Sequence, residues 1–384
     1  MRKWEEKRLG VLCSDISYGY TESAVYEKVG PKFLRITDIT GEYINWDSVP
    51  YCRITNSDFE KYKLQYNDIV IARTGATSGY NKQFIKSIDV VYASYLIRFR
   101  IDEKKADARY VYYYLQSNAY KGFIKNYISG AAQPGINATI LSKFKIRLPD
   151  VYIQKKIAKI LSAYDDLIEA NNWRIELLEQ TAQELYQEWF VRFRFPGYEK
   201  VKFENGLPEG WRYGKFKDEL NYFTGKLDSN AAVQNGEYCF YTCAKTIYRT
   251  NSFCFDGECV LLGGNNATGD FSLFYANEKL DAYQRTYIVT PQNMILSCVY
   301  IYFVLKDYLL QFKTASAGVT TKFLTKEMLN KTKIVVPDEK IIFRYNTVTK
   351  NMFEQIVLLK KRNENLIAQR DMLLPRLMSG KLKV

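Results

Sequence analysis

Two stretches of this chain carry the same residue pattern 188 positions apart. Residues 111–153 align with residues 299–341 without a gap, and 13 of the 43 aligned positions are identical. Unrelated segments of this length would share about three positions, so the match indicates a duplication. For a chain of 384 residues, the duplication predicts two domains with the same fold rather than one large core.

The residues that precede each repeat predict mixed α/β domains. Residues 68–79 and 258–269 each run from an apolar segment, typical of a strand, into a turn that contains glycine. Other segments rich in Val, Ile, Tyr and Phe are also expected to be strands: residues 32–39, 89–101 and 238–243. We therefore expect an α+β fold with similar domains at residues 1–150 and 211–337, joined by a linker at residues 193–210.

Each predicted domain is followed by a long stretch with coiled-coil spacing. Asp150 and Asp338 are suitable helix N-caps, so we expect helices over residues 151–192 and 338–374, with a C-terminal tail at 375–384. Seam residues three and four positions apart follow in both helices. On the first helix they are Ile153, Ile157, Ile160, Tyr164, Leu167, Asn171, Ile175, Leu178, Ala182, Leu185 and Trp189. On the second they are Ile341, Tyr345, Val348, Met352, Ile356, Leu359, Asn363, Leu366, Leu373 and Leu377.

Two matching seams in one chain favour an antiparallel coiled coil between the two helices, with a pseudo-two-fold internal repeat. In that arrangement Asn171 and Asn363 are polar seam positions that fix the register. The alternative is that each helix packs only on the core of its own domain.

The charge of the chain favours a polyanionic partner. Lys and Arg total 55 against 42 Asp and Glu, which gives a formal charge of +13, and nucleic acid is the leading candidate. The 32 tyrosines suit both sheet cores and stacking on bases. The chain has no histidine, which excludes Ser-His-Asp and Cys-His catalysis and histidine-bound metals.

Other chemistry has weak support in the sequence. Cys239, Cys243, Cys254 and Cys259 are loosely spaced for zinc and are expected to be small buried side chains. Residues 337–340 (PDEK) are expected to cap a helix rather than to bind magnesium, because a nuclease needs carboxylates from separate strands. The N-terminus lacks a signal-like apolar region, and the longest largely apolar run, residues 294–305, is too short to span a bilayer. We therefore expect a cytoplasmic protein with reduced thiols.

Several motifs, taken in order, resemble those of the specificity subunit of Type I restriction–modification systems. In the first half Gly130, residues 146–149 (IRLP) and Gln154 form the transition from domain to helix. The remaining likeness lies in residues 161–169 (LSAYDDLIE), 182–195 (AQELYQEWFVRFRF), 207–211 (LPEGW) and 370–382 (RDMLLPRLMSGKL). The second half departs from the pattern, since residues 317–322 lack Gln-Pro and residues 342–344 (IFR) replace the usual Gln.

The resemblance implies two target-recognition domains, each reading one half-site of double-stranded DNA, with the paired helices setting the distance between the half-sites. It implies two methyltransferase subunits that modify adenine N6 and two restriction–translocase subunits as partners, in a defence system against phage. S-adenosylmethionine, ATP and Mg²⁺ would belong to those partners. This chain would have no cofactor, catalytic residue or metal of its own, and it indeed lacks both a Pro-Pro-Tyr-type methylation motif and a Walker motif.

Base and phosphate contacts are expected from polar side chains in loops. In the first domain the candidates are Arg73, Thr74, Thr77, Ser78, Lys82, Gln133 and Asn137. In the second domain they are Asn265, Asn266, Thr268, Thr320, Thr321 and Lys322. For each, a solvated loop residue without a DNA contact is the alternative, and Tyr80 is expected to pack in the core rather than to stack.

Two other classes of function remain open. A two-headed coiled-coil adaptor that binds proteins and not DNA would explain the duplication and the helices. A self-sufficient enzyme is disfavoured by the missing histidines and motifs. The duplicated domains differ in their loops, which predicts that a DNA target would be bipartite and asymmetric.

Overall fold

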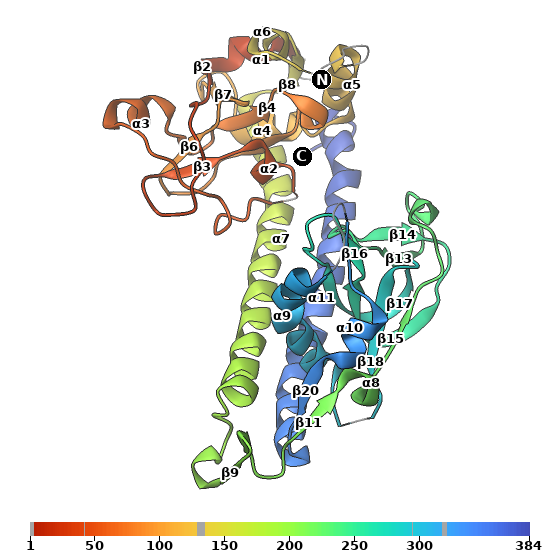
Figure 1. Cartoon of the computed structure of the whole chain (residues 1–384). Coiled ribbons are helices and arrows are strands. Elements are labelled where there is room, and N and C mark those ends of the chain that lie inside the picture. Colours follow the sequence, from red (N-terminus) through yellow and green to blue (C-terminus); the bar gives the residue numbers. More distant parts are fainter. Residues whose placement is uncertain (1–3, 42, 129–134, 294, 317–320) are drawn as a thin grey trace. The chain divides into compact units, whose positions relative to one another are not determined.

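The computed structural model describes residues 4–41, 43–128, 135–293, 295–316 and 321–384. The chain forms two compact units (Figure 1). Unit 1 comprises Met1–Ala170 and Asn363–Val384, and unit 2 comprises Asn171–Arg362. Both units contain strands and helices, as the sequence predicts, and each includes part of both long helices.

Unit 1 is built on an antiparallel four-stranded sheet in the order β2-β7-β4-β5, with a parallel pair β3-β6 and an antiparallel pair β1-β8 beside it. The strands are β1 (Glu5–Arg8), β2 (Cys13–Tyr18), β3 (Lys32–Leu34), β4 (Ile69–Ala72), β5 (Asn81–Gln83), β6 (Val90–Tyr92), β7 (Leu96–Ile101) and β8 (Lys145–Leu148). The short helices are α1 (Leu9–Leu12), α2 (Ile36–Ile39), α3 (Asn56–Tyr62), the 3₁₀ turn η1 (Gly75–Thr77), α4 (Ala108–Tyr114), α5 (Asn118–Ile128) and α6 (Ala138–Ser142).

Two predicted strands of unit 1 are interrupted. The expected strand at residues 32–39 ends at Leu34, and α2 follows, with its first turn held by the Asp38 carboxylate, which accepts from the Arg35 backbone N–H at 2.8 Å. The expected strand at residues 89–101 is divided into β6 and β7 by a tight turn, in which the Leu96 N–H donates to the Ala93 carbonyl at 2.8 Å.

Unit 2 is built on a six-stranded sheet in the order β12-β18-β15-β17-β13-β14, and only the β13-β17 pair is parallel. Its strands are β9 (Phe203–Glu204), β10 (Leu207–Pro208), β11 (Arg212–Lys215), β12 (Leu220–Thr224), β13 (Tyr238–Tyr241), β14 (Tyr248–Thr250), β15 (Phe255–Gly263), β16 (Asn265–Asn266), β17 (Leu273–Ala282), β18 (Thr286–Pro291), β19 (Lys322–Phe323) and β20 (Lys333–Val336). Its shorter helices are a π-helical turn (Gln187–Val191), η3 (Tyr198–Lys200), α8 (Phe216–Glu219), η4 (Ser229–Ala231), α9 (Cys298–Ala315) and α10 (Lys326–Lys331).

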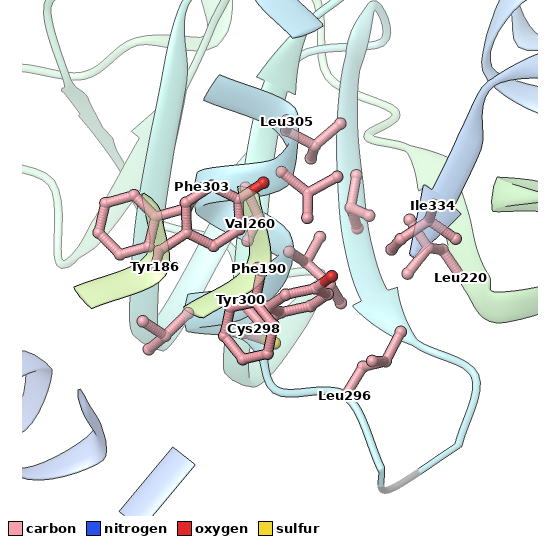
Figure 2. Close-up of a cluster of buried hydrophobic side chains, with 14 of the residues drawn as sticks. Tyr186, Phe190, Leu220, Val260, Leu296, Cys298, Tyr300, Phe303, Leu305 and Ile334 are labelled. Carbon is pink, nitrogen blue, oxygen red and sulfur yellow. The ribbon is translucent and has the colours of Figure 1, made fainter. Parts of the chain in front are cut away.

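The core of unit 2 is rich in aromatic rings (Figure 2). Phe190, from the π-helical turn, packs edge-on against Tyr300 of α9, with ring centroids 4.8 Å apart. The same ring lies 4.9 Å from the Tyr345 ring. Edge-to-face pairs of this kind stabilise a core beyond the effect of burying apolar surface. They therefore hold α9 against the π-helical turn and against the segment that contains Tyr345.

The two long helices are α7 (Val151–Tyr186) and α11 (Glu339–Met378). In unit 1, Arg370 near the end of α11 pairs with Asp165 in the first half of α7 at 2.6 Å. In unit 2, Lys360 near the middle of α11 lies 3.8 Å from Glu179 in the second half of α7, and the Tyr345 ring lies 6.1 Å from the ring of Trp189, which follows α7. As the residue number rises from Glu179 to Trp189, that of the contacting residue on α11 falls from Lys360 to Tyr345, so the two segments are antiparallel in unit 2. Helix α11 continues through Pro375 to Met378, four residues beyond the expected end at 374, so the expected tail is shorter.

Three seam positions assigned from the sequence are wrong. Ile160, Leu167 and Val348 are exposed, and the next residue in each case is buried instead: Leu161, Ile168 and Thr349. The buried stripe is displaced because both helices also cover their own domains, where Leu161 packs in the core of unit 1. Of the other seam positions, Ile157, Asn171, Tyr345, Leu359 and Asn363 are buried, and Tyr164, Leu178, Leu185, Met352 and Leu366 are half-buried.

The duplication has a two-residue offset that the gapless alignment conceals. Tyr110 and Tyr300 occupy the same place, because their hydroxyls donate to the carbonyls of Arg147 and Val335 at 2.6 and 2.8 Å. This pair lies 190 residues apart, whereas the helix caps Asn137 and Thr325 lie 188 apart. The interruption between α4 and α5 in unit 1, where α9 is continuous in unit 2, accounts for the two extra residues.

The shift of the buried position from Ile160 to Leu161 can be tested by substitution. Leu161 has no exposed surface and Ile160 is 37% exposed. We expect Leu161→Ala to lower the free energy of unfolding by about 2–5 kcal/mol, because it leaves a cavity in the core. Ile160→Ala, the matched control, should cost well under half as much. Chemical denaturation measures both, and equal losses would place the seam at Ile160.

Candidate nucleic-acid interface

Three segments that are distant in sequence meet at one edge of the sheet of unit 1. The turn after β4 is joined to the segment before α6, since the Ile136 N–H donates to the Arg73 carbonyl at 2.8 Å. The same turn is joined to the β6–β7 turn, since the Arg73 N–H donates to the Tyr95 carbonyl at 3.0 Å. Thr74 also forms a β-bridge with Gly135. Two groups of residues that the sequence analysis selected separately, around Arg73 and around Asn137, are thus neighbours.

The side chain of Arg73 lies on an aromatic ring. Its guanidinium carbon is 5.0 Å from the centroid of the Tyr18 ring, and the Tyr18 hydroxyl accepts from the Ala138 N–H at 3.1 Å. Tyr18 therefore connects the end of β2 to this edge.

The turn itself depends on two glycines and an inward-facing serine. Gly75 and Gly79 have φ values of +73° and +89°, and a Cβ at Gly79 would lie 2.7 Å from Ile124 of α5. The Ser78 side chain is buried and its hydroxyl donates to the Gly75 carbonyl at 2.8 Å. Ser78 therefore stabilises the turn, and its selection as a surface contact is wrong. Thr77 remains half-buried beside it.

Two further candidates of unit 1 have other roles in the structure. Asn137 is the N-cap of α6, since its Oδ1 accepts from the Ile140 N–H at 2.9 Å. Lys82, on β5, lines a cavity of about 370 Å³ in unit 1 together with Arg109 and Lys121, and no residue of the turn 73–77 lines that cavity. In the β4–β5 pair, Lys82 lies opposite Val70, three residues before Arg73. Gln133 lies outside the described residues.

Unit 2 repeats the same meeting of three segments. The Leu324 N–H donates to the Gly264 carbonyl at 2.8 Å, and the Gly264 N–H donates to the Arg285 carbonyl at 2.7 Å. Strands β16 and β19 pair Asn265 with Phe323 and Asn266 with Lys322. Four sequence-selected residues, Asn265, Asn266, Thr268 and Lys322, are therefore brought to one site, and the half-buried Thr321 adjoins them.

Most polar side chains of this loop hold the loop itself. The Asn266 Oδ1 accepts from the Thr268 N–H at 2.8 Å, the Thr268 hydroxyl at 2.9 Å and the Asp270 N–H at 3.2 Å. The Lys313 ammonium, hydrogen-bonded to Asp270 at 2.6 Å, and the Thr268 hydroxyl lower the pKa of that carboxyl. Lys322 donates to the Ser316 carbonyl at 3.2 Å. Thr320 lies outside the described residues.

Four residues at these sites were not among those predicted from the sequence. They are Tyr18 and Tyr95 in unit 1, and Arg285 and Phe323 in unit 2, where the Arg285 guanidinium lies 5.4 Å from the Phe323 ring centroid. Tyr95 was missed because its turn was placed inside one long strand. Tyr80 was expected in the core, but the structure exposes it at the end of the turn.

The four cysteines considered as metal ligands differ in burial. Cys239 and Cys259 are buried in an apolar cluster, and burial raises the pKa of the Cys259 thiol above its usual range. Cys243 is half-buried and Cys254 is exposed, so the expectation that all four are buried is wrong for these two. Among residues with described positions, no three His, Cys, Asp or Glu side chains gather as metal ligands do. Nor does any helix formed by those residues have the length and apolarity needed to cross a membrane.

Comparison with known proteins decides the family. The model of the Type I restriction modification DNA specificity domain matches residues 1–180 and 208–363. This chain belongs to that family. The specificity-subunit architecture, with its repeated domain, therefore covers nearly the whole chain, and the resemblance inferred from sequence motifs is confirmed.

Related specificity subunits cover most of this chain. The Type I restriction enzyme MjaIX specificity subunit of Methanocaldococcus jannaschii is 26% identical over 72% of this chain and 69% of its own length. A second subunit of that organism, putative MjaX, is 25% identical over 99% of this chain and 94% of its own. In fold, the chain is similar to the crystal structure of the S subunit from M. genitalium, with a TM-score of 0.60, 16% identity and coverage of 98% and 96%.

The cap role of Asn137 in this specificity-family fold can be separated from a DNA contact. Serine caps a helix about as well as asparagine, whereas alanine costs about 1 kcal/mol. We expect Asn137→Ala to lower thermal stability and Asn137→Ser to retain it, with the bound DNA sequence unchanged by Asn137→Ser. A loss of sequence preference in a stable Asn137→Ser protein would instead assign a base contact to Asn137.

Proposed function

We propose that this chain is the non-catalytic DNA-reading subunit of a Type I restriction–modification complex. The proposal is based mainly on three segments that meet in the same way in both units. In unit 1 they are the turn after β4, the β6–β7 turn and the segment before α6, and in unit 2 they are the turn after β15, the β17–β18 turn and the segment before α10. The chain's formal charge of +13 is suited to a DNA duplex. The family match supports recognition of a DNA sequence by these domains.

Each domain reads one half-site, and the target is bipartite and asymmetric. The two converged sites have the same backbone pairing but different side chains, with residues 73–78 (RTGATS) in one and 264–269 (GNNATG) in the other. Base contacts are made by side chains. Two sites with the same backbone hydrogen bonds but different side chains are therefore expected to recognise two different half-site sequences.

The partners are two methyltransferase subunits and two restriction subunits. Helix α7 supports docking of partner helices, because its apolar Trp173 side chain is 68% exposed in unit 2 and the nearby Leu177 is also exposed. The partners supply the chemistry, adenine N6 methylation with S-adenosylmethionine and translocation with ATP and Mg²⁺, while this chain selects the site.

A genome-wide map of N6-methyladenine tests this function. Cells that express this chain with its cognate methyltransferase subunit should gain a two-part motif with one methylated adenine in each part and a constant gap. Cells with the methyltransferase subunit alone are the control. If the complex assembles but no motif appears, and if the complex shows no salt-dependent binding to duplex DNA, the protein-adaptor alternative is favoured.

If the long helices set the distance between the two half-sites, insertion of residues into both helices should lengthen the gap between them. Seven residues added after Ala170 in α7 and seven before Asn363 in α11 lengthen each helix by about 10 Å. We expect the gap in the methylated motif to grow by up to about three base pairs, since base pairs are about 3.4 Å apart, with both half-sites unchanged. Seven residues inserted in the exposed loop 244–246 are the control and should leave the gap as it is. A changed half-site in the helix variant would contradict the spacing role.

A further inference from the structure

Each unit places one arginine on an aromatic ring at its converged site. The Arg73 guanidinium lies over Tyr18 at 5.0 Å, and the Arg285 guanidinium lies over Phe323 at 5.4 Å. Tyr18 and Phe323 are 40% and 39% exposed, so each pair is at the surface. An aromatic ring under a guanidinium holds its plane by cation–π attraction and leaves the N–H edge accessible.

Neither guanidinium is engaged by a protein acceptor in the described part of the chain. No carboxylate or carbonyl there accepts a hydrogen bond from the side chain of Arg73 or Arg285. Two other arginines of unit 1 differ in this respect: Arg98 pairs with Asp15 at 2.7 Å, and Arg100 pairs with Asp68 at 2.8 Å. Arg98 and Arg100 stabilise the sheet through these ion pairs. In contrast, the guanidinium N–H groups of Arg73 and Arg285 are available to donate hydrogen bonds to a ligand.

The two arginines occupy non-equivalent positions in the pattern of backbone hydrogen bonds that both units share. The Arg73 backbone donates to the carbonyl of Tyr95 and accepts from Ile136, and the Gly264 backbone makes the same two bonds with Arg285 and Leu324. Arg73 thus corresponds to Gly264, and Tyr95 corresponds to Arg285. The arginine lies on the turn after the strand in unit 1 and on the neighbouring turn in unit 2.

We propose that Arg73 and Arg285 each read one guanine in their own half-site, and that the ring beneath each arginine positions it. A planar guanidinium donates two parallel hydrogen bonds to guanine O6 and N7 in the major groove, the commonest specific arginine contact. Because the arginines are on different turns, the two guanines lie at different places relative to the other contacts of each domain. This inference rests on the proposed function.

Lysine and alanine variants of the full chain, each co-expressed with the cognate methyltransferase subunit, test the proposal by methylation mapping. In Arg73→Lys and Arg73→Ala, one position of one half-site should lose its preference for guanine by about 5- to 150-fold, with every other position unchanged. Arg285→Lys and Arg285→Ala should relax one position of the other half-site only. Lysine keeps the charge but cannot form the bidentate contact.

Arg147→Lys is the matched control. Arg147 is an exposed arginine whose guanidinium lies over an aromatic ring, 5.8 Å from the Trp4 ring centroid, and it belongs to β8 rather than to any of the three converged segments. Arg147→Lys should leave the motif unchanged. Phe323→Leu should relax the same position as Arg285→Lys, and Phe323→Tyr should restore the guanine preference, because the ring is the positioning group.

Three results would overturn the proposal. One is a wild-type motif in which either half-site has no required guanine. Another is a lysine variant that keeps the guanine preference. The third is an alanine variant that weakens binding to all sequences equally and reduces the slope of log affinity against log salt concentration by about one, as the loss of a phosphate contact does. A wild-type complex that assembles but directs no methylation would overturn the proposed function and this inference with it. Size-exclusion chromatography of each variant complex verifies assembly.

Discussion

A pair of backbone hydrogen bonds on a single residue organises the candidate interface in each unit. Arg73 in unit 1 and Gly264 in unit 2 accept from the segment before a short helix and donate to a neighbouring strand turn. Both bonds use main-chain atoms, so the same pair of bonds is formed by an arginine in unit 1 and by a glycine in unit 2. Unit 2 nevertheless requires glycine at this place, because a Cβ on Gly264 would lie 2.5 Å from the Arg285 carbonyl oxygen.

The two units solve the contact between domain and helices in different ways. In unit 2 the contact is aromatic, with Phe353 of α11 lying 4.6 Å from the Tyr275 ring and fully buried. In unit 1 the helices also contribute apolar residues such as Leu161 and Leu377 to the core, and a polar cluster is added, where the Tyr113 hydroxyl donates to Asp165 at 2.6 Å and Arg370 pairs with the same carboxylate. The conserved backbone frame thus coexists with unlike packing, as expected for duplicated domains that have diverged.

The large features of this fold could be predicted from the sequence because they depend on repeated patterns. The duplication and the two long helices follow from residue spacing, whereas the meeting of the residues around Arg73 with those around Asn137 was not predicted. Single positions depend on tertiary contacts that the spacing does not contain. Ile160 and Leu161 are both apolar, and only packing on unit 1 decides that Leu161 is buried. Ser78 and Asn137 are polar loop residues, but their hydrogen bonds go to the turn and to α6. Arg285 was missed because nothing in the sequence indicates that its turn lies beside Gly264.

The division of α11 between the units has a consequence for the order in which the chain folds. Leu374, Leu377 and Met378 complete the core of unit 1, whose other residues come from the first 170 positions. In a chain that is made from its N-terminus onward, these three residues follow the whole of unit 2, so the core of unit 1 cannot close until unit 2 has been made. Unit 2 is complete by Arg362, and the later part of the chain therefore reaches its final packing before the earlier part does.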